Sequence, residues 1–388
     1  MTTTTRPTTD HAGSLRASLE QGYTLPAEWY TDPAFFAAER QRIFRHCWQY
    51  VGLTEQVTRT GDFFTTWLGE VPVVVVRDAP DTLRAFVNVC RHRGSTLVLD
   101  ACGHRNTLQC HYHAWTYNLD GSLRAAPGSK DEPGFDRAAF PLLPVQVANF
   151  GPFIFVNPDA DAPPLATILG DLPRQVAATG LDFPGLHRRV RREYDIAANW
   201  KVVLDNYLEC YHCPIAHKGF SDLIDLEHYD VAEYEYVSTQ GGPLTPAARA
   251  GTARSQLYDT SQGVRDGFYA FVWPNFTLNI YPGPGYVSLN LFVPVDEHHT
   301  KAIYEYCFVD AVSAEQEQQF VRFIDQVQQE DIVLCESVQR GLRSGFFERG
   351  RLMLHREKGL RHFQQLVHRF LTAPSPPAAT PQDPPVAP

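Results

Sequence analysis

Two pairs of cysteine and histidine residues constrain the fold of this chain more than any other feature. Cys90 and His92 form a C-x-H pair, and Cys110 and His113 form a C-x2-H pair that begins after a gap of 17 residues. The four residues are expected on loops at strand ends, where metal sites are commonly built. Cysteines and histidines scattered through a hydrophobic core would not explain this order.

The ligand types point to one kind of metal centre. Two thiolates on one iron and two imidazoles on the other form the ligand set of a Rieske [2Fe-2S] cluster. Neutral imidazoles in place of anionic thiolates raise the reduction potential, which suits a one-electron relay. A structural zinc site is the alternative, although a C-x-H pair cannot close around a zinc ion as a C-x2-C pair does.

Composition indicates an ordinary soluble globular chain. Of the 388 residues, 44% are hydrophobic and 20% are charged, and no apolar run approaches the roughly 20 residues that a membrane span requires. The N-terminal segment lacks the apolar region of a secretory signal. The net charge of −10, without a block of Lys or Arg, argues against nucleic-acid binding.

Cysteine usage favours a reducing compartment. Eight cysteines are too few for a disulfide framework in a chain of this length. Two are assigned to the cluster, and the other six are expected to be free thiols: Cys47, Cys102, Cys210, Cys213, Cys307 and Cys335. We therefore predict a cytoplasmic protein.

The hydrophobic pattern predicts an all-β domain in the first half of the chain. Residues 1–22 are expected to be a disordered lead, and apolar residues at helical spacing predict a helix over 27–50. Short strands are then predicted over 71–76, 83–90 and 150–156, and a hairpin with an Asp-Gly turn over 115–123. A cluster-binding domain is accordingly assigned to 51–160.

A second domain is predicted over 161–371, after an Asp/Pro-rich stretch. It is expected to contain strands over 286–294 and 300–309 and helices over 313–343 and 357–371. Ser313 and Gln316 resemble a capping box at the start of the longer helix. The Pro/Ala-rich tail over 372–388 is expected to be disordered.

The segment 199–217 is dense in possible metal ligands. On a helix, Asp205, Glu209 and His212 would share one face, because they are three or four residues apart. A proline after His212 is expected to distort the helix and bring His217 back towards it. Two converging histidines need one carboxylate to complete the facial triad of a mononuclear Fe(II) oxygenase, which leaves positions for O2.

The carboxylate would come from a later helix that carries Glu330, Asp331 and Glu336. Composition alone does not choose among them, and a solvated helix face is the simpler interpretation. Buried histidines with satisfied hydrogen bonds would likewise account for His212 and His217. The upstream cluster favours a metal site, because a cluster needs an electron acceptor.

These motifs resemble the large (α) subunits of Rieske non-haem iron oxygenases over nearly all the ordered chain. N-V-C-R-H-R-G and C-H-Y-H-A-W are similar to the family's Rieske signature, and D-N-Y-x-E-C-Y-H-C-x3-H is similar to its iron motif. Glu209, the C-Y-H-C around His212 and the E-D-x4-E-S-V-Q-R-G-L from Glu330 are most similar to choline, carnitine, glycine betaine and stachydrine monooxygenases.

The resemblance implies a role for individual residues. Cys90 and Cys110 would bind one cluster iron, His92 and His113 the other, and His212, His217 and Asp331 the mononuclear iron. Glu209 would bridge a cluster histidine and an iron histidine, and Asp205 would support the ligands from behind.

The resemblance also implies a fold and an assembly. The fold would be α+β, with an all-β Rieske domain and a helix-grip catalytic domain of antiparallel sheet and long helices. Residues 23–50 would pack on the catalytic domain. The assembly would be a homotrimer in which the cluster of one subunit passes electrons to the iron of the next.

The expected activity is that of a terminal oxygenase. No G-x-G-x-x-G follows a strand, so NAD(P)H and flavin would act on a separate reductase, with or without a ferredoxin. A betaine-like quaternary ammonium substrate would be hydroxylated or N-demethylated in an aromatic cage, for which Trp273, Phe276 and Tyr281 are candidates. The alternatives are ring hydroxylation of an aromatic or other carboxylated molecule and, more remotely, an electron-transfer protein without oxygenase activity.

Overall fold

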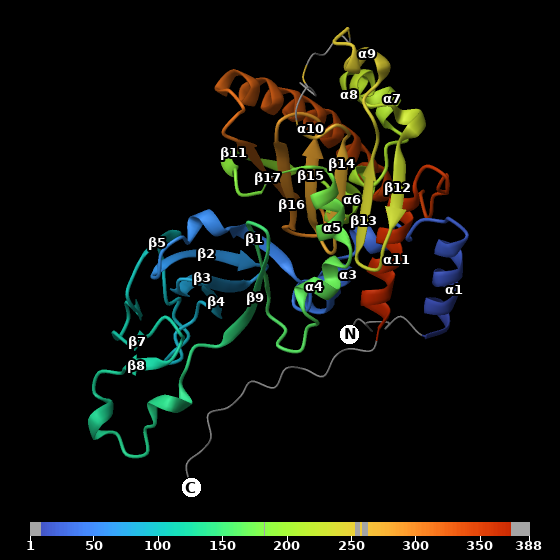
Figure 1. Ribbon diagram of the computed structural model, residues 1–388. Coiled ribbons are helices and arrows are strands. Elements are labelled where there is room, and N and C mark those ends of the chain that lie inside the picture. Colours follow the sequence, from blue (N-terminus) through green and yellow to red (C-terminus); the bar gives the residue numbers. More distant parts are fainter. Residues whose placement is uncertain (1–8, 182, 253–256, 258–262, 374–388) are drawn as a thin grey trace. The chain divides into compact units, whose positions relative to one another are not determined.

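The computed structural model describes residues 9–181, 183–252, 257 and 263–373 (Figure 1). These residues form two compact units. Phe44–Leu165 form the first, and the described residues up to Ile43 form the second together with Ala166–Ala373. In the described ranges, no helix is both long enough and apolar enough to cross a membrane.

The first unit is an all-β domain, coloured blue to green in Figure 1. A seven-stranded sheet has the order β1-β10-β9-β4-β3-β2-β5, and a three-stranded sheet has the order β6-β7-β8. The strands of the large sheet are β1 (Gln49–Leu53), β2 (Asp62–Leu68), β3 (Val71–Ala79), β4 (Thr82–Val87), β5 (Cys102–His104), β9 (Pro144–Phe150) and β10 (Phe153–Asn157). Those of the small sheet are β6 (Leu108–Gln109), β7 (Thr116–Tyr117) and β8 (Leu123–Ala125).

Strand β3 connects the core of this unit to the loops that carry the cysteines. Val73–Val76 are fully buried because alternate side chains enter two different cores. Val74 and Val76 pack in the core that contains Cys90 and Cys110. A strand that is buried on both faces shows a continuous apolar run instead of an alternating one.

The second unit contains a seven-stranded antiparallel sheet in the order β11-β17-β16-β15-β14-β13-β12. Its strands are β11 (Leu186–Ile196), β12 (Asp230–Glu233), β13 (Val237–Gly241), β14 (Phe268–Val272), β15 (Phe276–Tyr281), β16 (Tyr286–Pro294) and β17 (Thr300–Val309). The helices are α1 (Thr9–Glu20), α2 (Glu28–Thr31), α3 (Pro33–Glu39), α5 (Leu172–Ala178), α6 (Trp200–Tyr207), α7 (Cys213–Ala216), α8 (Lys218–Leu223), α9 (Pro246–Arg249), α10 (Ala314–Leu342) and α11 (Lys358–Thr372). A further short helix, α4 (Leu165–Leu169), begins at the boundary between the units.

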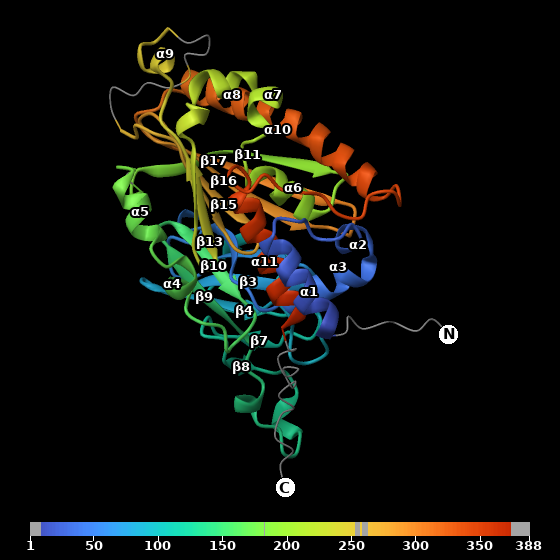
Figure 2. The ribbon, with the colours of Figure 1, turned by 90° about the vertical axis from the view of Figure 1, so that its right-hand side faces the viewer.

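The long helix α10 covers one face of this sheet (Figure 2). Phe320 is fully buried and contacts the rings of Tyr281, Tyr286 and Phe308 from three strands. Serine at the start of α10 forms the predicted capping box, in which Ser313 and Gln316 exchange hydrogen bonds. The apolar face of α10 therefore lies on the sheet. The same side of the helix carries Asp331, the carboxylate that the family resemblance selects as an iron ligand.

The predicted α+β fold class is confirmed, and the bounds of β16 and β17 agree with the predicted strands. The Asp120-Gly121 turn lies between β7 and β8, with Gly121 at φ 88°. Both predicted C-terminal helices are present as α10 and α11.

Three predictions about secondary structure were wrong. The helix predicted over 27–50 is divided into α2 and α3, which a π-helical turn over Arg40–Phe44 follows, and Gln49 already begins β1. The strand predicted over 150–156 is a hairpin, because Gly151, at φ 55°, turns the chain between β9 and β10. Disorder was predicted over 1–22, yet Thr9–Glu20 form α1, whose buried Leu15 and Leu19 lie on the side that contacts α11. Residues 1–8 and 374–388 lie outside the described residues.

Candidate metal centres

The two loops of the first unit repeat one backbone conformation. In one loop, Gly94 N donates to Cys90 O at 3.0 Å and Cys90 N donates to Ser95 O at 2.8 Å. In the other, Ala114 N donates to Cys110 O at 3.1 Å and Cys110 N donates to Trp115 O at 2.8 Å. The fourth residue after each cysteine has a positive φ, which is 73° in Gly94 and 57° in Ala114.

The side chains of these loops gather by type. Cys90 and Cys110 are buried in the same core, and the rings of His92 and His113 have centroids 4.6 Å apart. The His92 ring also stacks on Trp115 at 4.9 Å. One pair of thiols next to one pair of imidazoles fits a two-iron cluster in which each iron takes one kind of ligand.

A hydroxyl group lies beside one of the thiols. Tyr117 Oη lies 3.5 Å from Cys90 Sγ and accepts a hydrogen bond from Arg91 N at 3.0 Å. Burial and the hydrogen bond to Cys90 raise the pKa of Tyr117 above its usual value, so the phenol keeps its proton. It can therefore donate to a thiolate at this position, an interaction that tunes the potential of a bound cluster.

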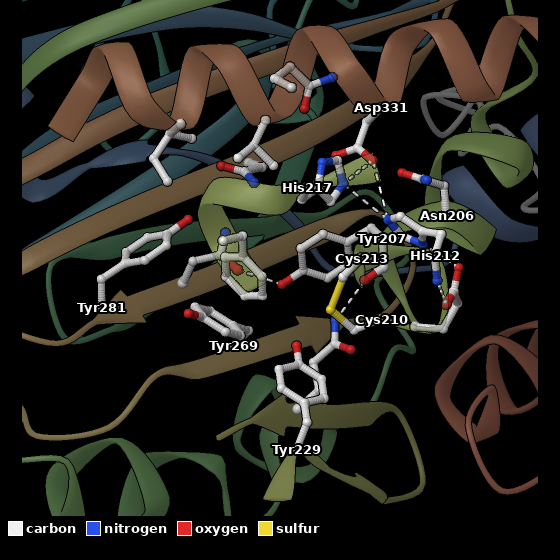
Figure 3. Close-up of a pocket in the computed structure, with 18 of the residues that line it drawn as sticks. Asn206, Tyr207, Cys210, His212, Cys213, His217, Tyr229, Tyr269, Tyr281 and Asp331 are labelled. Atoms are coloured by element: carbon white, nitrogen blue, oxygen red, sulfur yellow. Dashed lines mark hydrogen bonds and ion pairs between the residues drawn. A yellow bond between two sulfur atoms is a disulfide. The ribbon is translucent and has the colours of Figure 1, made fainter. Parts of the chain in front are cut away.

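In the second unit, the ligand atoms of His212, His217 and Asp331 converge at one point (Figure 3). His212 Nε2 lies 3.1 Å from His217 Nε2 and 3.4 Å from Asp331 Oδ1. His217 Nε2 lies 2.9 Å from Asp331 Oδ1. Ligand atoms that bind a metal at about 2.1 Å and at right angles are about 3.0 Å apart, so these residues fit one face of an octahedral ion.

Two glutamates hold the outer nitrogens of the histidines. Glu209 Oε1 lies 2.5 Å from His212 Nδ1, and Glu330 Oε2 lies 2.8 Å from His217 Nδ1. The sequence alone indicates only that Glu330 belongs to a solvated face of its helix. Its only sequence signal was its place beside Asp331, and its contact with His217 depends on the packing of α10.

The carboxylates favour positive charge at this point. Burial alone would lower the pKa of His212, but hydrogen bonds to Asp331 and Glu209 outweigh it and raise the pKa to about 10. Burial would raise the pKa of Asp331, but the two imidazoles outweigh it and hold that pKa below its usual value. A divalent cation would supply the same positive charge in place of the two imidazole protons.

The helix face predicted for Asp205, Glu209 and His212 was wrong. Helix α6 ends at Tyr207, so Glu209 and His212 lie in the connection to α7. Asp205 instead bonds to residues of α2 and α11: its Oδ2 accepts from Tyr30 Oη at 2.7 Å and from Gln364 Nε2 at 3.0 Å.

A cavity that is partly open to solvent lies against the three ligands (Figure 3). It is lined by the rings of Tyr207, Phe220, Tyr229, Tyr269, Tyr281 and Tyr304. Two buried acceptors, Gln240 Oε1 and Asn290 Oδ1, also belong to lining residues and have no hydrogen-bond partner in the described part of the chain. The cavity thus combines aromatic faces with unused acceptors.

The three candidates for the aromatic cage lie in different places. Tyr281 lines the cavity, but Trp273 and Phe276 are not among its lining residues. Trp273 packs on Trp200 and Phe363 in the core, and Phe276 is 2% exposed. Strand position alone had not shown which end of β15 faces the cavity, and the correct end is that of Tyr281.

The prediction of six free thiols was wrong for one pair. A disulfide joins Cys210 and Cys213, with Cα atoms 5.0 Å apart, at the edge of the cavity. The chain bends sharply between α6 and α7, which brings side chains three residues apart together. The other four cysteines are thiols, as predicted.

Two family models match the chain. Residues 47–147 match the Rieske [2Fe-2S] domain, and residues 183–373 match the catalytic domain of the ring hydroxylating alpha subunit. The first match supports the cluster over the zinc alternative.

Curated relatives cover most of the chain. Choline monooxygenase (chloroplastic) from Arabidopsis thaliana is 38% identical over an alignment of 369 residues that covers 91% of this chain and 84% of the relative. The carnitine monooxygenase oxygenase subunit from Escherichia coli K12 is 31% identical over an alignment of 360 residues that covers 90% of this chain and 94% of the relative.

Solved structures show the same fold. The quaternary ammonium Rieske monooxygenase CntA in complex with L-carnitine superposes with a TM-score of 0.79 at 29% identity, and the match covers 92% of this chain and 97% of CntA. Naphthalene 1,2-dioxygenase from Rhodococcus sp. superposes with a TM-score of 0.75 at 20% identity, with 94% of this chain and 99% of that chain covered.

Proposed function

This chain belongs to the family of Rieske oxygenase α subunits that includes choline and carnitine monooxygenases, and we propose that it oxidises a quaternary ammonium compound. As a Rieske non-haem iron oxygenase it uses a [2Fe-2S] cluster, a mononuclear iron and O2, with electrons from a partner reductase. The alternative of a cluster protein without oxygenase activity is therefore set aside.

The proposal includes seven metal ligands, four for the cluster and three for the mononuclear iron. Cys90 and Cys110 bind one cluster iron and His92 and His113 the other, while His212, His217 and Asp331 bind the mononuclear iron. The distances of about 3 Å among the last three ligand atoms support this assignment. Iron bound there supplies the centre at which O2 is reduced and a C–H bond of the substrate is oxidised.

The cavity supports a cationic substrate. A quaternary ammonium group has no hydrogen to donate, so it is held by aromatic faces, each worth about 0.5–2 kcal/mol, and by nearby negative charge. Tyr269, Tyr281 and Tyr304 line the cavity, and the carboxylate of Glu209 supplies negative charge beside it. The unused oxygens of Gln240 and Asn290 suit a donor elsewhere on the substrate.

The assembly is proposed as a homotrimer. The CntA structure is described as giving insight into inter-subunit electron transfer, and the same route here would take electrons from His92 or His113 of one subunit to Glu209 of the next. Glu209 suits this position, because it already contacts Nδ1 of the iron ligand His212. The reductase would be a separate flavin and iron–sulfur protein that oxidises NAD(P)H.

A single-turnover experiment tests the proposal. The purified protein is reduced chemically, freed of reductant and mixed with O2 and either quaternary amines or aromatic acids. We expect the quaternary amines, but not the aromatic acids, to accelerate reoxidation of the cluster by O2. Formaldehyde would then mark oxidation of an N-methyl group, because the hydroxylated carbon leaves the nitrogen as formaldehyde. Acceleration by aromatic acids alone would contradict the proposal and indicate ring hydroxylation.

A further inference from the structure

We propose that Glu330 is a positioning residue for the mononuclear iron: its carboxylate holds Nδ1 of His217, so that Nε2 of the same ring is presented to the metal. The inference rests on the proposed assignment of His212, His217 and Asp331 as iron ligands.

Glu330 and Asp331 are consecutive residues of α10, yet they contact opposite edges of one imidazole ring. Glu330 Oε2 lies 2.8 Å from His217 Nδ1, and Asp331 Oδ1 lies 2.9 Å from His217 Nε2. The ring is 3% exposed, which leaves it little room to turn. Gln326 Nε2 donates to the other oxygen of Glu330 at 3.1 Å and fixes the carboxylate from behind.

The other histidine is held in the same way from a different element. Glu209, in the connection after α6, contacts Nδ1 of His212, while His212 Nε2 faces Asp331. A carboxylate at Nδ1 keeps a proton there and leaves the lone pair of Nε2 for a metal. Two separate glutamates thus select the same tautomer in both rings. Glu209 also has a proposed role in electron transfer, so its substitution would change two functions at once. Substitution of Glu330 tests the orientation of the imidazole by itself.

The contact should act on metal affinity through both orientation and charge. A carboxylate that accepts a hydrogen bond from Nδ1–H makes Nε2 a stronger electron-pair donor to the metal. Loss of such a partner typically weakens metal binding by about 10–100-fold. The Glu330 side chain is 31% exposed, which places the expected effect towards the lower end of that range. Glutamine keeps an oxygen that can accept from Nδ1 but removes the charge, so Glu330→Gln should weaken binding less than Glu330→Ala.

The test measures Fe(II) affinity in the full-length protein, without reference to turnover. Mononuclear iron is titrated in competition with a chromophoric chelator, and the cluster absorbance of each sample reports the amount of folded Rieske domain. The electron paramagnetic resonance spectrum of the ferrous site, with nitric oxide as the probe, reports the ligand field. Gln329→Ala, at an exposed neighbour on α10, controls for disturbance of the helix, and Glu336→Gln controls for loss of one charge from it.

The inference is supported if Glu330→Ala weakens Fe(II) binding by about 10–100-fold and alters the nitric oxide spectrum, Glu330→Gln does so less, and both controls resemble the parent protein. An affinity of Glu330→Ala equal to that of the parent overturns it, as does equal weakening in either control. If the parent protein binds no iron beyond its cluster, the proposed function fails as well, and this is seen before any variant is made.

Discussion

The two metal-binding regions differ in how the chain assembles their ligands. In the first unit, all four proposed ligands lie between Cys90 and His113, on two loops that share one pattern of backbone hydrogen bonds. In the second unit, the ligands extend from His212 to Asp331, and the distant carboxylate arrives only because α10 packs across the sheet. One site is defined by local turns, and the other depends on tertiary packing.

The difference also extends to the groups that support the ligands. Around the cluster loops, support comes mainly from backbone amides and from one phenol, Tyr117. Around the iron site, it comes from the side chains of Glu209 and Glu330. Changes at the iron site should therefore act through charge, and changes at the cluster loops through conformation or a single hydrogen bond.

The largest expected effect is that of Asp331→Ala. Removal of the only carboxylate among the three converging ligands should release the mononuclear iron, so iron content falls from about three to about two per chain. Turnover should fall below detection, while the cluster absorbance stays unchanged because its ligands lie in the other unit. Glu336→Gln is the control on the same helix. Retained activity, or parallel loss of the cluster, would show that the two sites are not separate in this way.

The same contrast explains what could be predicted from sequence. The cluster ligands were visible because Cys90, His92, Cys110 and His113 are close in the chain and spaced by turn geometry. His212 and His217 were visible for the same reason, but composition could not distinguish Asp331 from its neighbours, and only the family resemblance selected it. Contacts between distant segments, such as Glu330 with His217, leave no local pattern to read.

The errors followed the same rule. The N-terminal segment over Thr9–Glu20 looked too polar to fold by itself, and its helix is stabilised by packing on α11. Strand composition made Trp273 and Tyr281 equally plausible as cavity residues. It could not distinguish them, because the position of the cavity depends on where α10 and α7 lie against the sheet. Local periodicity assigned the strands but not the part of each strand that meets a ligand.

Asp205→Asn tests whether buried charge behind the iron site affects stability. Burial raises the pKa of Asp205 to about 7, above the roughly 3.9 expected in the unfolded chain. The ionised carboxylate therefore disfavours folding: its cost is absent below pH 4, grows as the pH rises and is complete above pH 7. The variant should raise the free energy of unfolding at pH 8 by about 1–4 kcal/mol, with little change at pH 4.

Chemical denaturation of both proteins at the two pH values measures the difference. Asparagine can still accept the hydrogen bonds from Tyr30 and Gln364 through its oxygen, so the comparison isolates the charge. Equal destabilisation at both pH values would mean that packing, and not ionisation, dominates at this position.

Tyr117→Phe should lower the cluster potential, although it also removes the acceptor of the Arg91 N hydrogen bond in the first loop. Loss of the hydroxyl proton near Cys90 Sγ removes a hydrogen bond that stabilises the more negative, reduced cluster. A contribution of about 1 kcal/mol corresponds to a potential lower by about 40 mV for one electron. Spectroelectrochemical titration measures it, with Tyr112→Phe as the control, because the Tyr112 ring contacts His113 but its side chain is 54% exposed. Equal shifts in both variants would exclude a specific role for Tyr117.

The smallest expected effect concerns the residue with a positive φ in each of the paired cluster loops. Gly94 and Ala114 occupy equivalent positions, and Ala114 is the only residue other than glycine with a positive φ in the described chain. A left-handed conformation costs alanine roughly 1–2 kcal/mol, and glycine avoids this cost. Glycine also has greater conformational freedom in the unfolded state, which offsets part of the gain in stability. Ala114→Gly should therefore raise the free energy of unfolding by about 1 kcal/mol or less.

Gly94→Ala should lower the free energy of unfolding by a similar amount, since a Cβ at Gly94 would meet no atom within 4 Å and only the backbone conformation opposes it. Denaturant titration of the holoprotein compares the two variants, and the cluster absorbance confirms that both loops still bind it. Opposite signs of the two changes would show that the loops are equivalent in conformation. Destabilisation by Ala114→Gly would contradict this equivalence, because it would mean that the alanine methyl group makes a contact that outweighs its backbone strain.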